Sequence, residues 1–356
     1  MIHDVLVAGA GPAGALAATL LARKGFCVVL ADGVDPARHK IGEHLAAEAV
    51  HLLRRLQIDI QPERHVPNGG ILSCWGSEHL IATDSFNDPE GPGLLLDRAA
   101  FDAALRANAV AAGAEFRSAN VTSLRRESDW GATLRDGSAV SARWLIDASG
   151  RRSLLARQLG IGRKRDARMA AVYRIGANHR PRLDRTMVEA TAGGWWYAAD
   201  LPDGRSIAGF HLGIDQAAAF ARQPDAWAQA LNETLHIKIR FPPPIFATRL
   251  APIEAGGASL ARFSGDGWLA CGDAALAFDP VSGHGMLAAI HQGALASDCV
   301  ADMLAGATTA LHDYSGRLGQ FRAAYLRRLR EVYLQERRWR SMPFWSSCTQ
   351  PLQEVV

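Results

Sequence analysis

The chain has 356 residues, of which 48 % are hydrophobic and 21 % charged, a composition ordinary for a globular protein with a sizeable core. The formal net charge is only +3, and lysine and arginine are scattered, so nucleic-acid binding has little support. The five cysteines form no CxxC pair, which argues against a disulfide framework or an essential metal and favours a reducing, cytoplasmic compartment. An apolar run begins almost at once and no apolar run is long enough to span a bilayer, so we expect neither a signal peptide nor a membrane span.

A glycine-rich loop follows the first apolar run and opens a predicted helix over 12–24. The loop reads Gly9-Ala-Gly-Pro-Ala-Gly14. Gly9 permits the tight turn, Gly11 lets the backbone approach a pyrophosphate, and Gly14 allows close packing of helix on strand. Pro12 falls in the first helical turn, where a missing N–H costs little. The pattern predicts that a dinucleotide binds at this helix N-terminus.

A second predicted strand, residues 27–31, ends at Asp32, 18 residues after Gly14. This distance suits a carboxylate that accepts a hydrogen bond from a ribose hydroxyl. The strand completes a strand–helix–strand unit typical of dinucleotide-binding domains. The alternative is a glycine-rich turn in an unrelated α/β domain.

The next segments alternate between helices and strands. We expect a hairpin at Asp136-Gly137, between strands at 131–134 and 139–145. The second of these strands leads into Asp147-Ala-Ser-Gly150, and Ser153 is placed to cap the helix that follows. The other elements expected in this half are helices over 44–56 and 153–159, a helix into which 94–101 leads and which continues to about residue 112, and strands within 71–86 and 114–146.

Residues 169–212 read as short strands, which predicts an antiparallel sheet inserted between two cofactor-binding halves. Strand alternation would place Trp195 and Tyr197 on one face of this sheet and Trp196 on the other. These rings either wall an aromatic substrate pocket or belong to the core. The last elements expected are helices over 225–235, 286–304 and 311–337 and a strand over 268–271, and the tail from Pro343 has no clear period.

A third strand–turn segment runs from Cys271 to Met286. Asp273 follows the buried strand and is placed to accept from a ribityl hydroxyl. Pro280 and Gly283-His-Gly285 precede the long helix, whose N-terminus would favour negative charge on a reduced flavin. FAD is long enough to need a further segment of the chain that binds its far end. The alternative interpretation is a capped helix preceded by an ordinary loop.

The three segments, in this order and spacing, resemble the FAD-dependent monooxygenase superfamily with the para-hydroxybenzoate hydroxylase (PHBH) fold, which includes flavin-dependent halogenases and geranylgeranyl-reductase-like enzymes. The segment 38–43 resembles the one that reaches the flavin, and 96–102 resembles the helix whose Arg contacts the cofactor. The resemblance implies an α/β fold, with a Rossmann-like FAD-binding domain of the GR2/PHBH type, an inserted antiparallel-sheet substrate domain and C-terminal helices. The implied ranges are 1–70, 94–165 and 262–310 for FAD binding, 71–93 and 166–261 for the substrate sheet, and 311–356 for the C-terminal helix and tail.

Motifs and resemblance together give a set of expected cofactor-binding residues. They are Gly9, Gly11, Pro12, Ala13, Gly14, Asp32, Lys40, Gly42, Glu43, Arg98, Val121, Asp147, Gly150, Gly272, Asp273, Pro280, Gly283, Gly285 and Met286. Arg38 and Lys40 would pair with pyrophosphate charge or belong to a solvated loop. The Asp-Ala-Ser-Gly sequence at 147–150 is more similar to the corresponding segment of halogenases and reductases than to that of NADPH-using hydroxylases. The electrons are therefore expected from NAD(P)H either directly or through a separate flavin reductase.

The resemblance implies a monooxygenase that hydroxylates an aromatic, phenol- or indole-like substrate, free or borne on a peptide or carrier, using O2 and a flavin C4a-hydroperoxide. Tyr197, Trp196 and His284 are the candidate catalytic side chains, and His284 is either a proton donor or a solvent-facing loop residue. The Trp-Trp-Tyr segment and the aromatic C-terminal region are similar to small flavoproteins that modify tryptophan during maturation of quinone-cofactor enzymes.

Three alternatives stay open. The first is a halogenase, although the chain departs from the halogenase Trp-x-Trp-x-Ile-Pro box and has no Lys between Gly42 and Asp97. The second is a geranylgeranyl-type C=C reductase, which would need a long apolar tunnel. The third is a non-catalytic flavin-binding assembly protein.

Overall fold

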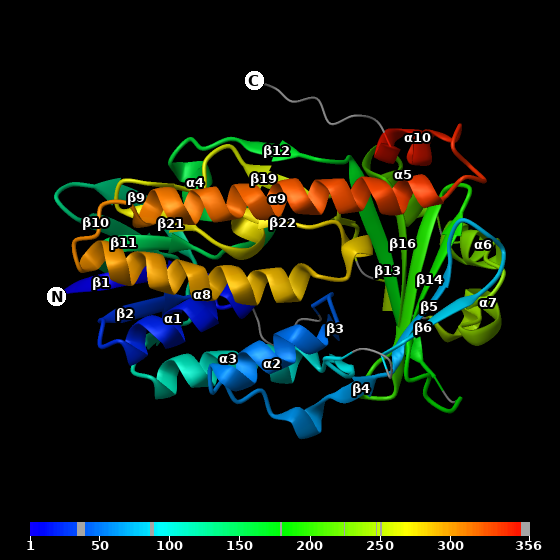
Figure 1. Ribbon diagram of the computed structural model, residues 1–356, viewed down its shortest axis with the longest axis horizontal. Coiled ribbons are helices and arrows are strands. Elements are labelled where there is room, and N and C mark those ends of the chain that lie inside the picture. The colour runs from blue at the N-terminus through cyan, green and yellow to red at the C-terminus, as the bar shows by residue number, and fades with distance from the viewer. Residues whose placement is uncertain are drawn as a thin grey trace.

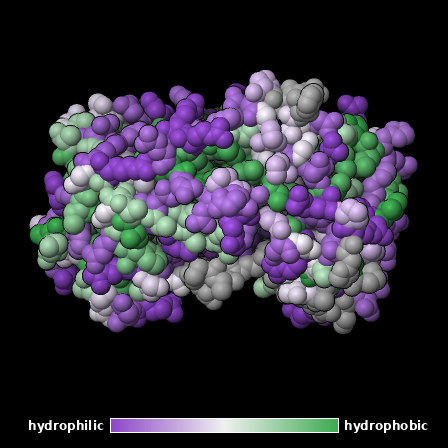
Figure 2. Space-filling view, turned by 90° about the horizontal axis from the view of Figure 1, so that it is seen from below, coloured by the Kyte–Doolittle hydropathy of each residue, from purple (hydrophilic) through white to green (hydrophobic). Residues whose placement is uncertain are grey.

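The computed structural model describes residues 1–33, 40–85, 89–178, 180–223, 225–246, 248–249 and 251–349. Its strands form two large and two small sheets, and helices pack between and around them (Figure 1). Seen from below, the molecule has two lobes that meet at a narrower waist, and hydrophilic residues predominate on this face (Figure 2). The α/β class predicted from the sequence is confirmed, whereas the exact domain boundaries stay a prediction.

The first large sheet brings the three glycine-containing segments to one edge. Its strand order is β20-β21-β11-β1-β2-β8, with β10 and β9 attached beyond β11. The strands β21, β11, β1 and β2 run parallel, so their carboxyl ends lie together and the loops after them converge. The strands of this sheet are β1 Ile2–Ala8, β2 Val28–Ala31, β8 Glu115–Arg117, β9 Val121–Arg126, β10 Trp130–Leu134, β11 Ala139–Asp147, β20 Ser264–Gly265 and β21 Trp268–Ala270.

The second large sheet is mostly antiparallel, as predicted for 169–212. Its order is β17-β13-β16-β15-β14-β5-β6, with β18 also paired to β13. Because side chains alternate along a strand, the two faces of the sheet pack against different helices. One face packs against α9 (Ala310–Gln335) and α10 (Pro343–Thr349), and the other packs against α5 (Ile214–Arg222), α6 (Ala226–Asn232) and α7 (Ile237–Arg240). Its strands are β5 Gly70–Cys74, β6 Ile81–Asp84, β13 Met169–Ala177, β14 Thr186–Thr191, β15 Gly194–Asp200, β16 Arg205–Gly213, β17 Thr248–Arg249 and β18 Ile253–Glu254.

A long C-terminal helix, α9, ties the two sheets together (Figure 1). Near its start, the hydroxyl of Tyr314 donates to the carbonyl of Ala270 in the first sheet at 2.6 Å. Near its end, the hydroxyl of Tyr333 accepts from the indole N–H of Trp195 in the second sheet at 3.2 Å. Its 26 residues give it the reach for both contacts. The helix therefore fixes the spacing of the two sheets, and the site lies between them.

The expected helices are all present, but the structure adds α5 Ile214–Arg222 and α7 Ile237–Arg240, which the sequence did not predict, and it differs at two further places. The expected helix over 44–56 starts later, because His44 and Leu45 pair with β7 as a strand. The tail, for which no period was found, forms α10, and its Phe344 and Trp345 are buried against the second sheet. The helices are α1 Pro12–Arg23, α2 Ala47–Arg55, α3 Arg98–Ala111, α4 Leu154–Gln158, α5 Ile214–Arg222, α6 Ala226–Asn232, α7 Ile237–Arg240, α8 Gly285–Leu304, α9 Ala310–Gln335 and α10 Pro343–Thr349. The small sheets contain β3 His44–Leu45, β4 Val66–Asn68 and β7 Gly93–Leu95, and β12 Arg163–Arg165, β19 Ala258–Leu260 and β22 Leu276–Ala277.

Candidate cofactor and substrate site

The glycine loop between β1 and α1 is shaped by contacts that leave no room for side chains at two of its glycines. A Cβ on Gly14 would lie 1.9 Å from the carbonyl oxygen of Gly9, and a Cβ on Gly9 would lie 2.2 Å from the carbonyl oxygen of Ala148. At Gly11 an added Cβ would meet no atom within 4 Å. The first turn of α1, which begins at Pro12, therefore presents its free N–H groups to open space.

Asp32 follows β2 and closes the other side of this loop. Its carboxylate accepts from the backbone N–H of Ala10 at 2.7 Å and is 8 % exposed. Asp32, Val121 and Lys40 line a cavity of about 220 Å³ that also touches Gly9 and Gly11. The predicted ribose acceptor thus lies beside the predicted phosphate loop. Arg38, predicted with Lys40 for phosphate charge, lies outside the described residues.

Asp147 lines neither this cavity nor the larger one described below, which corrects its expected role as a direct cofactor ligand. It is fully buried and accepts from the N–H groups of Leu155 and Ala156, both at 2.9 Å, and from Ser149. The carboxylate therefore caps α4 and shapes the turn, and burial raises its pKa. The predicted cap, Ser153, does not cap the helix: its hydroxyl donates to the carbonyl of Ala274 instead.

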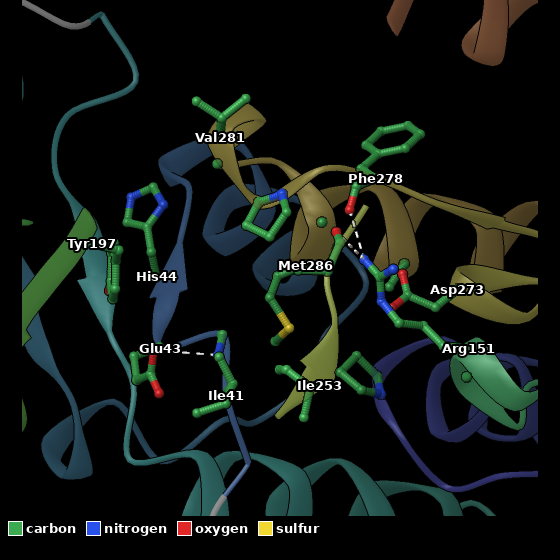
Figure 3. A pocket seen from close by; sticks show the side chains of 18 of the residues that line it. Ile41, Glu43, His44, Arg151, Tyr197, Ile253, Asp273, Phe278, Val281 and Met286 are labelled. Atoms are coloured by element: carbon green, nitrogen blue, oxygen red, sulfur yellow. Dashed lines mark hydrogen bonds and ion pairs between the residues drawn. The ribbon is translucent and has the colours of Figure 1, made fainter. Parts of the chain in front are cut away.

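The third segment lines a larger cavity of about 370 Å³ between the two large sheets (Figure 3). Gly272, Asp273, Pro280, Gly283, Gly285 and Met286 all contribute to its wall. Arg151, which the sequence reasoning missed, holds this segment: its guanidinium donates to the carbonyls of Phe278, Gly256 and Ala255 at 2.8, 2.6 and 3.1 Å. Gly285 begins α8, and a Cβ there would meet no atom within 4 Å.

Arg98, at the start of α3, lines the larger cavity and also holds the loop at Ile41 and Gly42 that forms part of the cavity wall. Its guanidinium donates to the carbonyls of Ile41 and Gly42 at 2.5 and 3.1 Å and pairs with Asp102 at 3.2 Å. Lys40 also pairs with Asp102, at 2.6 Å. The Arg-led helix therefore fixes the segment that carries Gly42 and Glu43 into the cavity wall.

Of the three candidate catalytic residues, Tyr197 lines the larger cavity and the other two do not. Trp196 is a correction: its side chain is fully buried on the opposite face of the sheet, stacked on Phe210 at 4.7 Å and edge-on to Trp227 at 5.1 Å. Strand alternation is the reason, and it was recognised in the sequence. His284 is exposed and hydrogen-bonds through Nδ1 to the carbonyl of Ser282, so it is not placed at the cavity wall.

Other aromatic and imidazole side chains line the larger cavity beside Tyr197. Trp195, Tyr173 and His211 line the larger cavity from the second sheet, and His44 lines it from β3. Burial lowers the pKa of His44. The sequence did not predict Tyr173 and His211 at the site, because they lie on β13 and β16 and join Trp195 and Tyr197 only through the pairing of these strands in the sheet.

The two cavities share Gly11, Ala148 and Gly150, so they form one elongated space. This space fits FAD: Gly11, Gly150 and Gly285 each leave room where a Cβ would stand, and the space runs from Asp32 past the α1 N-terminus to Met286. The chemistry of the wall also fits, with a carboxylate at one end, helix N–H groups in the middle and an apolar, aromatic end. Within the described ranges, no group of three or more His, Cys, Asp or Glu side chains could hold a metal ion.

A family model described as FAD binding domain matches residues 3–327. Among curated proteins, the putative FAD-dependent oxidoreductase LodB of Marinomonas mediterranea is 28 % identical over 367 residues, covering 96 % of each chain. A digeranylgeranylglycerophospholipid reductase of Methanosarcina acetivorans is 29 % identical, covering 95 % of this chain and 81 % of its own.

Two solved structures show the same fold. The myxobacterial chondrochloren halogenase CndH has a TM-score of 0.86 and 23 % identity, covering 99 % of this chain and 87 % of its own. The peptidyl tryptophan dihydroxylase QhpG has a TM-score of 0.83 and 25 % identity, covering 98 % of this chain and 79 % of its own. The predicted PHBH-type fold is therefore confirmed. No helix in the described part of the chain combines the length and apolar character needed to cross a membrane.

Proposed function

The chain belongs to the family described as FAD binding domain and is an FAD-dependent oxidoreductase, and from that premise we propose that it is a monooxygenase hydroxylating an aromatic, indole-like side chain borne on a peptide. The observation that carries the proposal is the wall of the larger cavity. Trp195, Tyr197 and Tyr173 line it from one sheet, opposite the Gly283–Met286 segment expected beside the flavin. Aromatic walls of this kind suit a flat ring.

The cofactor, when bound, supplies the reaction of reduced flavin with O2, and the chain supplies binding and orientation. The N-terminus of α1 would hold the pyrophosphate, and Asp32 would accept a hydrogen bond from the ribose. With two electrons from NAD(P)H, supplied directly or through a flavin reductase, and two protons, the overall reaction would convert the substrate and O2 into hydroxylated substrate and water. The aromatic part of the cavity wall, at Trp195, Tyr197 and Tyr173, would keep water from the reacting atoms.

The likeness to QhpG, whose name gives it a peptidyl tryptophan as substrate, supports an indole on a peptide. The two chains match over nearly all of this one. LodB, described as a putative FAD-dependent oxidoreductase, is similar over 96 % of both lengths, which supports flavin-dependent redox chemistry without specifying the substrate.

Two alternatives receive less support. The chain has four lysines, Lys24, Lys40, Lys164 and Lys238, and among the described residues none lines the larger cavity, whereas the halogenases it resembles need a Lys for the halogenating species. A C=C reductase would need an apolar tunnel, but Glu43, Arg151 and Glu254 all face this cavity.

The test uses FAD-loaded protein, reduced under nitrogen and mixed with isotopically heavy O2 and a short tryptophan-containing peptide. We expect the peptide to gain one or two heavy oxygen atoms by mass spectrometry, and a matched peptide with leucine in place of tryptophan to gain none. Loaded enzyme that oxidises its flavin without labelling tryptophan or tyrosine peptides, free indole or phenol would refute the proposal. A halogen mass shift in the presence of bromide would favour the halogenase alternative.

A further inference from the structure

In the second sheet, Tyr173 on β13 and Tyr197 on β15 lie on the two strands that flank β16, and both are paired with the same residue, Gly209. A Cβ on Gly209 would lie 2.2 Å from Cε1 of Tyr173. The ring of Tyr173 therefore lies over the glycine and leans across β16 towards the strand that carries Tyr197.

His211, two residues along β16 and on the same face, fixes the hydrogen bonding of Tyr173. Its Nδ1 lies 3.3 Å from the carbonyl oxygen of Trp195, which can only accept, so Nδ1 carries the proton. Nε2 then accepts from the Tyr173 hydroxyl at 3.1 Å. Burial lowers the pKa of His211 to about 3, so the ring is neutral and this tautomer holds at neutral pH. With its proton committed, the oxygen of Tyr173 is left only as an acceptor.

The hydroxyl of Tyr197, unlike that of Tyr173, has no protein partner among the described residues. This hydroxyl is buried, although the ring of Tyr197 lines the larger cavity. An unmade hydrogen bond of a buried hydroxyl is costly, which makes a bound ligand the natural partner.

Glu43 completes this end of the cavity. Its carboxylate lies on the same side as Tyr197 (Figure 3), and after burial it is the next cause that raises the pKa of both Tyr197 and Tyr173. Carboxylate oxygens accept, the Tyr173 oxygen accepts, and the Tyr197 hydroxyl oxygen, which has no partner among the described residues, has lone pairs that accept as well. A ligand atom placed among these groups is satisfied if it donates.

We propose that Tyr197, Tyr173 and Glu43 form a subsite that recognises a hydrogen-bond donor on the aromatic substrate, an indole N–H in the case proposed above. His211 and Gly209 are positioning residues: the first fixes which atom of Tyr173 accepts, and the second makes room for its ring. The inference rests on the proposed function, because it assumes that the ring of the substrate lies in this cavity. It adds that the site selects rings carrying an N–H or O–H over isosteric rings without one.

The test compares two probes on FAD-loaded protein by calorimetric titration. One is N-acetyl-tryptophanamide, and the other is its benzothienyl analogue, which replaces the indole N–H with sulfur at nearly the same shape. We expect the indole to bind about three- to tenfold more tightly to the unaltered protein, the range for one net hydrogen bond. Tyr197→Phe should remove this preference without lowering the thermal midpoint, since the hydroxyl it removes has no partner.

Trp196→Phe is the matched control, because it also removes a buried, unpartnered donor but on the far face of the same sheet. It should leave the preference intact. Equal binding of the two probes to the unaltered protein, or a preference that survives Tyr197→Phe, would overturn the inference while leaving the proposed function standing. Absence of binding by both probes would refute the indole proposal itself, and the inference with it.

Discussion

Gly11 and Gly14 should separate cofactor binding from folding, because alanine at the two positions meets different surroundings. The new methyl of Gly14→Ala would stand 1.9 Å from the Gly9 carbonyl oxygen and 2.8 Å from the Cβ of Ala148. The methyl of Gly11→Ala would meet no protein atom within 4 Å, and Gly11 has an extended backbone, with φ of −74°, that any residue adopts. Gly11→Ala therefore intrudes only on the space assigned to the pyrophosphate.

The expected magnitudes follow from these contacts. Gly14→Ala overpacks a backbone carbonyl that cannot rotate away, so the cofactor-free protein should lose about 3 kcal/mol of unfolding free energy or more. Gly11→Ala gives up only the modest preference of a helix N-cap for glycine over alanine, about 1 kcal/mol or less. Its affinity for FAD should nevertheless fall at least tenfold or so, because the backbone can no longer approach the phosphates.

The assay is urea unfolding of the cofactor-free variants, followed by titration with FAD monitored by quenching of flavin fluorescence. Two results would refute the reasoning. One is a loss of stability in Gly11→Ala as large as in Gly14→Ala, and the other is unchanged FAD affinity in a folded Gly11→Ala protein. Either would mean that the phosphate loop is not where the contacts place it.

Two further perturbations test the surroundings of the site. A His in the unfolded chain has a pKa of about 6.5, whereas burial lowers the pKa of His211 to about 3. Between these two pH values the unfolded chain binds the proton and the folded protein does not. The contribution of His211 to stability is therefore lost as the pH falls from about 6.5 to about 3. The unfolding free energy of His211→Gln should therefore decline less steeply on acidification, by up to about 1.4 kcal/mol per pH unit, and identical slopes in urea unfolding at a series of pH values would count against this. Asp147→Asn should cost about 1–3 kcal/mol in the same assay, because an amide keeps one acceptor oxygen and must turn its NH2 towards either the N–H groups of Leu155 and Ala156 or the N–H of Ser149. Asp273→Asn, which loses only a part-exposed ion pair with Arg151, is the control and should cost less than about 1 kcal/mol, so equal losses would contradict the capping role.

Local sequence signals predicted much of the fold. The Gly9–Gly14 loop, the hairpin at Asp136-Gly137 and the strands of 169–212 were identified because turn glycines and alternating hydrophobicity depend on a few neighbouring residues. The tail beyond Pro343 was missed for the same reason: α10 has only seven residues and is held by burial of Phe344 and Trp345 rather than by its own periodicity.

The sequence by itself determined that the chain carries three strand–turn segments built to approach a long, phosphate-bearing cofactor, because each glycine, proline and terminal acid acts on its own backbone. Only the tertiary structure decided what each acid does: Asp32 closes the phosphate loop, whereas Asp147 turns inward to cap a helix. It also decided that Tyr197 lies beside Tyr173 across Gly209, and that His284 lies away from the cavity. These outcomes depend on contacts between strands far apart in the chain, which no local pattern of residues contains.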